Sequence, residues 1–151
     1  MIKITTADKS HIDTIVNFQA KMAWQTEELE LDTVTVTKGV TAVFEDPAKG
    51  AYYVAKDGDK VIACLLTTPE WSEWRNGTVL WIQSVFVEED YRKQGIFRQM
   101  YSYLKEMVMA EENLMGLRLY VEKTNLRAQK VYEAIGMNGD HYQFFEWMKH
   151  F

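Results

Sequence analysis

The chain has 151 residues, a length that argues for one compact unit with a sizeable core. Its hydrophobic fraction of 47% and charged fraction of 26% fit a folded protein and exclude a disordered or collagen-like chain. With 17 Lys and Arg against 22 Asp and Glu, the formal charge is −5, so we expect neither nucleic acid nor an anionic membrane as a partner. A small amine is more compatible with this charge, although solubility alone would also explain it.

Cysteine and histidine offer little chemistry. Cys64 is the single cysteine, so the chain can form neither an internal disulfide nor a thiolate cluster for zinc. Because Cys64 lies in an apolar run, we interpret it as a core side chain. His11, His141 and His150 are dispersed without ligand spacing, so we expect no metal. No apolar segment is long enough for a secretion signal or a membrane span, and we expect a cytoplasmic protein.

The first 50 residues contain a short strand and two helix patterns. Ile2 and Ile4 alternate with polar residues as a strand would, and Asp8 or Ser10 can cap the helix that follows. The segment Thr33–Glu45 is rich in strand-favouring Val and Thr, yet its apolar residues recur at helical spacing. We predict a helix there.

Three strands are predicted next. Tyr52–Lys56 and Lys60–Thr68 are β-rich runs joined by a turn at Gly58, which indicates a hairpin. The run Val79–Val87 is apolar on both faces, as expected for a strand covered on both sides. We therefore predict that it lies in the middle of the sheet.

The last third of the chain alternates helices and strands. Apolar spacings of three and four predict an amphipathic helix over Ile96–Glu111, and Leu117–Val121 follows as a strand. A further helix begins at Asn125 and ends before Gly136, and Tyr142–Met148 is a last predicted strand. The fold class predicted is therefore α/β (α+β), a mixed sheet with helices on both faces.

The loop after the central strand carries the most chemistry. Arg92, Lys93 and Arg98 surround the predicted helix N-terminus, and the first turn contains no carboxylate. Because a helix N-terminus carries about half a positive charge, cations are unfavourable there unless an anion binds. Gly95 lacks a Cβ, so an anion can approach the backbone closely. A phosphate or pyrophosphate fits these facts, as does a solvated basic patch balanced by the preceding carboxylates.

Two motifs resemble those of the GCN5-related N-acetyltransferases (GNAT). Arg92-x-x-Gly95-x-Phe97 resembles the family's Arg/Gln-x-x-Gly-x-Gly/Ala loop, except that Phe97 stands where the family usually has Gly or Ala. The strand Leu117–Glu122 followed by Asn125, Ala128, Tyr132 and Gly136 resembles its second conserved block. The resemblance implies one GNAT-like domain over residues 1–151, a sheet of six to seven strands, and central strands that splay apart.

The resemblance also implies acetyl-CoA as the acyl donor. The residues expected to bind it are the main chain of Val85 and Val87, the loop residues Arg92, Lys93, Gln94, Gly95, Ile96, Phe97 and Arg98, and the helix-start residue Asn125. Tyr132 would lie near the sulfur and is the best candidate for the acid that protonates the departing thiolate. Gln83 could orient water or substrate, or instead satisfy a buried backbone group.

The proton acceptor and the amine site are less specified. Glu70, Glu73 and Glu122 are possible bases, although we favour a solvated surface position for each, and water is an acceptable base. Trp71 and Trp74 beside Glu73, in the connection before the central strand, could bind a cationic amine. Alternatively the tryptophans pack the hairpin loop while Arg75 pairs with a carboxylate.

The sequence thus predicts an N-acetyltransferase that transfers an acetyl group directly to an unidentified small amine in a ternary complex. A noncatalytic acyl-CoA-binding or regulatory module with the same fold is the alternative. Oligomeric state, monomer or homodimer, stays open at this stage.

Overall fold

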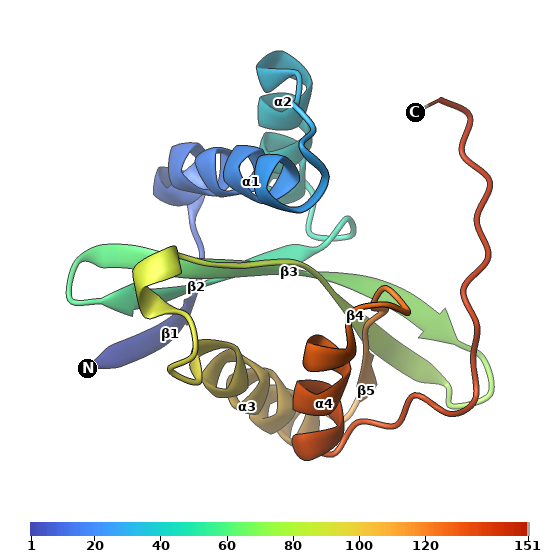
Figure 1. The fold of residues 1–151 in the computed structure, drawn as a ribbon. Coiled ribbons are helices and arrows are strands. Elements are labelled where there is room, and N and C mark those ends of the chain that lie inside the picture. Colours follow the sequence, from blue (N-terminus) through green and yellow to red (C-terminus); the bar gives the residue numbers. More distant parts are fainter. Residues whose placement is uncertain (151) are drawn as a thin grey trace. The chain divides into compact units, whose positions relative to one another are not determined.

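The computed structural model describes residues 1–150, and the chain divides into two compact units, Met1–Arg118 and the remainder from Leu119 (Figure 1). The first unit holds a sheet in the order β1 (Ile2–Thr6), β2 (Ala51–Asp57), β3 (Lys60–Ser72), β4 (Gly77–Val87) and β5 (Leu114–Arg118). Its helices are η1 (Lys9–His11), α1 (Ile12–Glu27), α2 (Thr33–Glu45), η2 (Glu89–Tyr91) and α3 (Ile96–Ala110). The second unit contains α4 (Leu126–Ala134). No helix among the described residues is both long and apolar enough to cross a membrane.

The sheet is mixed, as predicted, but differs from the prediction in three places. The strands β1 to β4 are antiparallel neighbours, and β4 pairs with β5 in parallel, so β3 rather than β4 is the middle strand. The strand predicted over Leu117–Val121 is instead β5, because pairing with Thr78 begins already at Leu114. The segment Tyr142–Met148 forms no strand, so the described residues contain five strands rather than six to seven.

Caps explain why α1 and α2 form where they do. Asp8 caps η1 in a capping box with His11, and α1 continues directly from that turn. Asp32 caps α2 by accepting a hydrogen bond from the Thr35 amide at 3.1 Å. The helical spacing of α2 buries Val40, and this packing overrides the strand preference of its Val and Thr residues.

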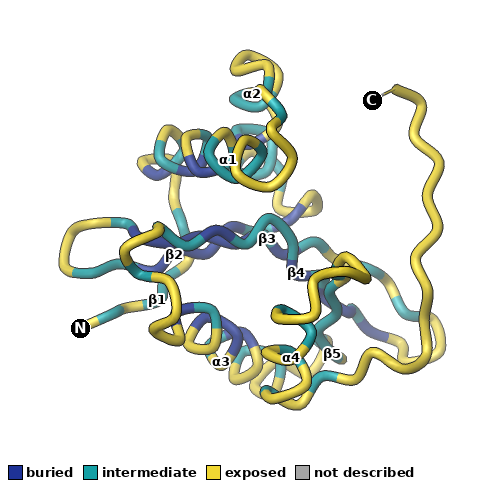
Figure 2. Tube along the Cα trace, viewed as in Figure 1, coloured by how far each residue is buried: buried dark blue, intermediate teal, exposed yellow. Residues whose placement is uncertain are grey.

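One core lies between the sheet and the helices α1 and α2, and α3 covers the opposite face (Figures 1 and 2). Phe18 of α1 packs against Phe86 of β4 with ring centroids 4.8 Å apart. Cys64 is buried in the same cluster, and burial raises the pKa of its thiol to about 12, which keeps it unreactive. On the α3 face, Tyr53 of β2 donates a hydrogen bond to the sulfur of Met107 at 3.4 Å.

Two glycines provide a matched test of this packing. A Cβ at Gly50, whose φ is +152°, would lie 2.4 Å from the Thr67 carbonyl oxygen, whereas a Cβ at Gly39 of α2 meets nothing within 4 Å. We expect Gly50→Ala to lower the free energy of unfolding by about 1 to 3 kcal/mol through overpacking. Gly39→Ala should raise it by about 0.5 to 1 kcal/mol because Ala is the better helix former. Urea denaturation measures both, and equal midpoints would contradict the close approach at Gly50.

Candidate active site

A β-bulge interrupts β4 next to the point where β5 stops. Leu66 pairs with Gln83 and Cys64 with Phe86, so two β4 residues, Ser84 and Val85, lie opposite one residue of β3. Ser84 has a φ of +52°, in the left-handed region that bulges use. This bulge has no signal in the sequence, because serine stands where glycine would have marked it.

The parallel ladder between β4 and β5 ends before β4 does. Its last pair is Trp81 with Arg118, whereas β4 continues to Val87. Within the described residues, the Ile82–Val87 part of β4 therefore has a strand neighbour only on its β3 side. This matches the predicted splaying of the central strands. On the side away from β3, the main-chain groups of this part of β4 pair with no strand of the described residues.

The exposed side chain of Arg92 stabilises the loop through contacts with the protein itself. Its Nε donates to the Val87 carbonyl at 2.9 Å, its terminal nitrogen donates to Gln25 of α1 at 2.7 Å, and its guanidinium lies 5.6 Å from the Phe86 ring centroid. The Val87 carbonyl is therefore engaged by Arg92. Gln94 likewise donates to the Asp90 carbonyl at 2.8 Å, so two of the predicted coenzyme-binding side chains stabilise the loop that carries them.

The N-terminus of α3 has the properties expected of an anion site. Gly95 is its N-cap with a φ of +75°, no side chain caps the helix, and the first turn contains no acidic residue. A Cβ at Gly95 would meet no atom within 4 Å, so the backbone faces open space. Lys93, with a φ of +62°, and Arg98 are both exposed beside it. Backbone amides of the first helical turn have no acceptor inside the helix, so they can donate hydrogen bonds to an anion here.

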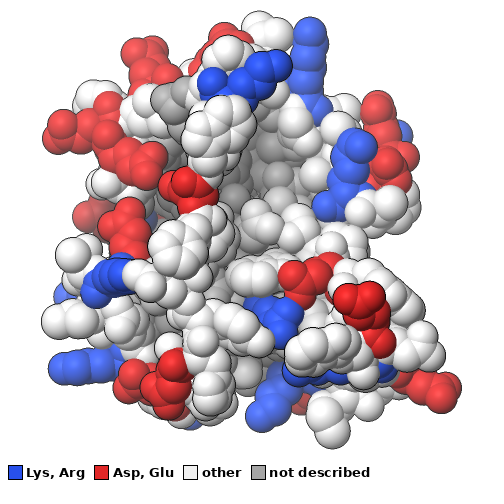
Figure 3. Space-filling view, turned by 90° about the vertical axis from the view of Figure 1, so that its right-hand side faces the viewer, with Lys and Arg blue, Asp and Glu red and all other residues white. Residues whose placement is uncertain are grey.

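The remaining loop residues face inward. Ile96 is buried, and Phe97 is half-buried with its ring 6.4 Å from that of Tyr101. The Phe97 side chain therefore packs along α3 rather than over Gly95. On the face that Figure 3 shows, the described acidic and basic side chains are intermixed without a broad field of one sign.

The predicted amine-binding segment divides between the two faces of β3. That strand runs to Ser72, so Glu70 and Trp71 belong to it rather than to the connection, and as neighbours they point to opposite faces. Glu70 pairs with Arg118, an ion pair that links β3 to β5 across β4. Trp71 and Trp74 are 64% and 92% exposed, so neither packs the hairpin.

The candidate polar residues on the sheet have partners of their own. The amide nitrogen of Gln83 donates to the hydroxyl of Thr68 at 2.6 Å, rather than to a backbone group. Arg75 donates to the hydroxyl of Ser72 at 3.3 Å, where the sequence suggested a carboxylate partner. Glu73 is exposed in the turn beside Trp74. These contacts fix Gln83 against the sheet and leave the turn open to solvent.

The second unit carries the other two predicted residues. The Asn125 side chain caps α4 by accepting from the Ala128 amide at 3.1 Å, so its carbonyl oxygen is engaged in the helix. Tyr132 is half-buried, and burial raises the pKa of its hydroxyl, which keeps the group protonated at neutral pH. Glu122 is exposed, and Gly136 follows α4 with a φ of +96°, as predicted for the helix end.

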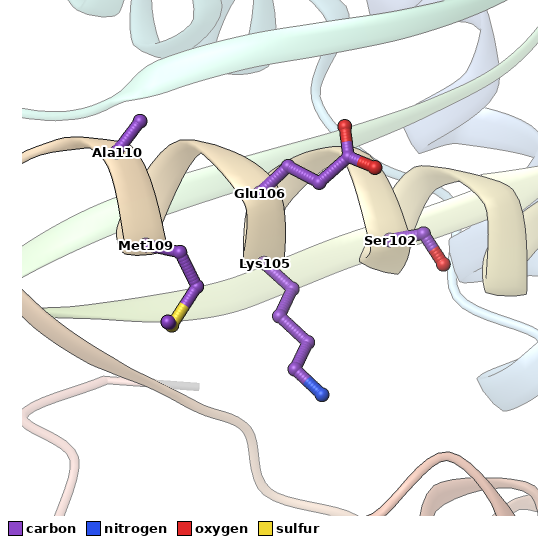
Figure 4. A pocket seen from close by; sticks show the side chains of 5 residues that line it. All are labelled: Ser102, Lys105, Glu106, Met109 and Ala110. Carbon is purple, nitrogen blue, oxygen red and sulfur yellow. The ribbon is translucent and has the colours of Figure 1, made fainter.

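Two hollows lie along α3 in the first unit. One follows the outer face of α3 and is lined by Ser102, Lys105, Glu106, Met109 and Ala110 (Figure 4). A second lies between α3 and β1 and includes Gly95 and Arg98. Only the second touches the predicted coenzyme loop, so the α3 hollow carries no part of the predicted chemistry.

The contacts of Arg92 predict that replacing it destabilises the protein more than replacing Arg98 does. Arg92→Ala removes two charge-assisted hydrogen bonds and should lower the free energy of unfolding by about 1 to 2 kcal/mol. Arg98→Ala, at an exposed position, should change it by less than about 0.5 kcal/mol. Chemical denaturation of the two variants checks this, and a larger loss for Arg98→Ala would overturn the supporting role of Arg92.

Comparison with known proteins identifies the family. The model of the acetyltransferase (GNAT) family matches residues 12–137. The crystal structure of a possible acetyltransferase from Clostridium difficile is 44% identical, with 98% of this chain and 97% of that chain covered and a TM-score of 0.91.

More distant structures share the fold. An integron cassette protein from V. cholerae is 19% identical, with 99% and 93% of the two chains covered and a TM-score of 0.83. AAC(6')-Iy, in complex with the bisubstrate analogue CoA-S-monomethyl-acetylneamine, is 14% identical, with 99% of each chain covered and a TM-score of 0.79. A second structure is that of the aminoglycoside N-acetyltransferase AAC(6')-Iy in complex with CoA. A search of curated proteins finds no match. The family model and the 44% identical structure together show that this chain belongs to the GNAT acetyltransferase family.

Proposed function

We propose that this protein is an acetyl-CoA-dependent N-acetyltransferase that transfers the acetyl group directly to the amine of a small acceptor in a ternary complex. The observation that carries the proposal is the uncapped N-terminus of α3, with Gly95 open to solvent and no acidic residue in the first turn. Family membership supports acetyl transfer in general, and the aminoglycoside enzyme supplies a related fold with a CoA analogue bound.

We expect main-chain groups to contribute more than side chains to the binding of acetyl-CoA. Amides from Lys93 to Arg98 would hold the pyrophosphate, with the Lys93 and Arg98 side chains adding positive charge, while Arg92 and Gln94 hold the loop in shape. Main-chain groups of β4 near Val85, beyond the end of β5, would receive the pantetheine arm. When bound, acetyl-CoA supplies an activated thioester acetyl group.

The reaction joins the acceptor nitrogen to the acetyl carbon and breaks the carbon–sulfur bond. The amine must arrive neutral, and its second proton leaves during or after the attack. Glu70 is occupied by Arg118, so water is the proposed proton acceptor. Tyr132 is the proposed acid for the departing thiolate, because a phenol hydroxyl is protonated at neutral pH and can donate.

For the acceptor, we keep Trp71, Trp74 and Glu73 as the proposed binding residues. Both indole rings are largely exposed, and Glu73 lies in the turn between β3 and β4 near them in sequence. A cationic amine gains from aromatic faces and a carboxylate together. Glu70 does not belong to this set, because it points to the opposite face of β3 and pairs with Arg118.

The noncatalytic alternative is supported by the ion pair of Glu70 with Arg118, which leaves the sheet without an evident base. A thiol-release screen with acetyl-CoA and grouped amines separates the two functions. Turnover with any amine group establishes the enzyme and its acceptor class. Tight coenzyme binding without turnover across the panel would instead favour the binding module.

Coenzyme binding at Gly95 can be tested with a matched glycine. We expect Gly95→Glu to weaken acetyl-CoA binding about tenfold or more, because it places bulk and negative charge beside the pyrophosphate. Gly58→Glu adds the same side chain at a φ of +61° in the β2–β3 turn, also with nothing within 4 Å of its Cβ. That control should bind as the wild type does in titration calorimetry. Equal affinity for both variants would refute the placement.

The acid role predicts a selective kinetic loss. Tyr132→Phe should lower kcat by about 100-fold or more and leave the affinity for acetyl-CoA unchanged, because only proton donation is removed. Tyr103→Phe, on α3 with its ring 5.9 Å from that of Tyr53, serves as the control for a lost hydroxyl. Thiol release at saturating substrates measures both. Unchanged turnover in Tyr132→Phe would remove Tyr132 as the acid.

A further inference from the structure

The short helix η2 lies just before the proposed coenzyme loop and is held by two separate elements of the first unit. From the β2–β3 hairpin, Asp57 at the end of β2 accepts a hydrogen bond from the Tyr91 hydroxyl at 2.7 Å (Figure 1). Lys60, which begins β3, places its Nζ 5.5 Å from the centroid of the Tyr91 ring. The hydrogen bond to Asp57 raises the pKa of the Tyr91 hydroxyl, so the phenol remains a donor at neutral pH. Both the ring and the hydroxyl of Tyr91 therefore contact the hairpin.

The second element that holds η2 is α1. The Nζ of Lys21 donates to the Glu88 carboxylate at 3.0 Å, and these two side chains are 39% and 23% exposed. One turn further along α1, Gln25 accepts the hydrogen bond from Arg92. Because residues four apart lie on the same face of a helix, one face of α1 contacts the chain immediately before and immediately after η2.

These contacts precede a stretch of unfavourable backbone conformation. Lys93 and Gly95 have φ angles of +62° and +75°, so both lie in the left-handed region. Glycine adopts this region readily, whereas lysine does so only where the surrounding structure fixes the chain. The helix α3 fixes the chain after Gly95, and the contacts of residues 88, 91 and 92 fix it before Lys93. The placement of the loop amides thus depends on side chains outside the loop.

We propose that Asp57, Tyr91 and Glu88 are positioning residues for coenzyme binding, which hold η2 so that the amides of residues 93–95 keep the conformation that binds a pyrophosphate. This inference rests on the proposed function, in which these amides bind acetyl-CoA. A loop that already has its binding conformation loses less conformational entropy when the ligand arrives. The contacts of η2 therefore strengthen coenzyme binding through the loop.

The sign of the effect separates this role from a role of charge alone. Asp57 and Glu88 are carboxylates, and a carboxylate near an anion site weakens anion binding by Coulomb repulsion. If the two residues acted through charge alone, removing either of them would strengthen the binding of CoA. If they position η2, removing either of them weakens binding although the repulsion is lost.

Titration calorimetry with CoA tests the proposal. Tyr91→Phe, Asp57→Ala and Glu88→Ala should each raise the Kd for CoA about three- to tenfold, the equivalent of one net hydrogen bond. Asp59→Ala and Glu89→Ala are matched controls, since each removes a neighbouring exposed carboxylate, and they should bind as the wild type does or more tightly. Tyr91→Phe is the cleanest variant, because it keeps Asp57 and the 3.8 Å contact of that carboxylate with the N-terminal amine.

Two further variants test whether the Tyr91–Asp57 hydrogen bond itself is responsible. Asp57→Asn keeps an oxygen that can accept from Tyr91, so it should restore most of the affinity that Asp57→Ala loses. The double variant Tyr91→Phe/Asp57→Ala should bind no more weakly than the weaker of the two single variants, because both changes remove one contact. Thermal unfolding verifies that each variant is folded at the titration temperature.

The outcomes distinguish this proposal from the proposed function. If the wild type binds CoA and Tyr91→Phe binds it equally well, the positioning role is overturned and coenzyme binding stands, even where Tyr91→Phe unfolds at a lower temperature. Tighter binding by Asp57→Ala and Glu88→Ala would overturn it in the same way and leave charge as their only effect. A wild type that does not bind CoA would overturn both proposals together.

Discussion

The candidate site depends on β4 extending beyond its parallel partner, β5. A parallel partner accompanies β4 only as far as Trp81, and the bulge at Ser84 then bends β4 while β3 continues to pair on the other side. Backbone amides and carbonyls need partners, so main chain with a ladder on one side only is satisfied by side chains, as Arg92 does for the Val87 carbonyl, by water or by a ligand. An extended ligand with its own amides meets that need, which is why this opening, rather than a hollow on α3, is where function should be sought.

The basic residues of the loop between β4 and α3 have different roles. Arg92 donates hydrogen bonds to the Val87 carbonyl and to Gln25, so its guanidinium stabilises the loop backbone. Lys93 and Arg98 are left exposed beside the open amides of α3. In the proposed function, anion recognition would rest on backbone geometry, with Gly95 permitting close approach. It would tolerate Phe97 where a small residue is usual, because that ring packs toward Tyr101.

Elements that local signals determine were predicted correctly. Apolar spacing located α2 and α3, and Gly58 located the hairpin. Features that depend on distant pairing were not predicted. Leu117, Leu119 and Val121 alternate as well as any strand, yet the register with β4 ends β5 at Arg118. The bulge at Ser84 and the Glu70–Arg118 ion pair depend on neighbouring strands, which periodicity cannot reveal.

The same ion pair bears on how the reaction loses its proton. Glu70 is the carboxylate that strand alternation aligns with Gln83 on one face of the sheet, but a guanidinium already occupies it. Releasing that carboxylate to act as a base would break its ion pair with the half-buried Arg118 guanidinium, a cost that a solvent-borne base avoids. Glu70 and Arg118 therefore serve best as a link that holds β5 beside the first part of β4, where the opening starts. The chemistry is left to the amine's own basicity, to water and to the proposed phenol acid.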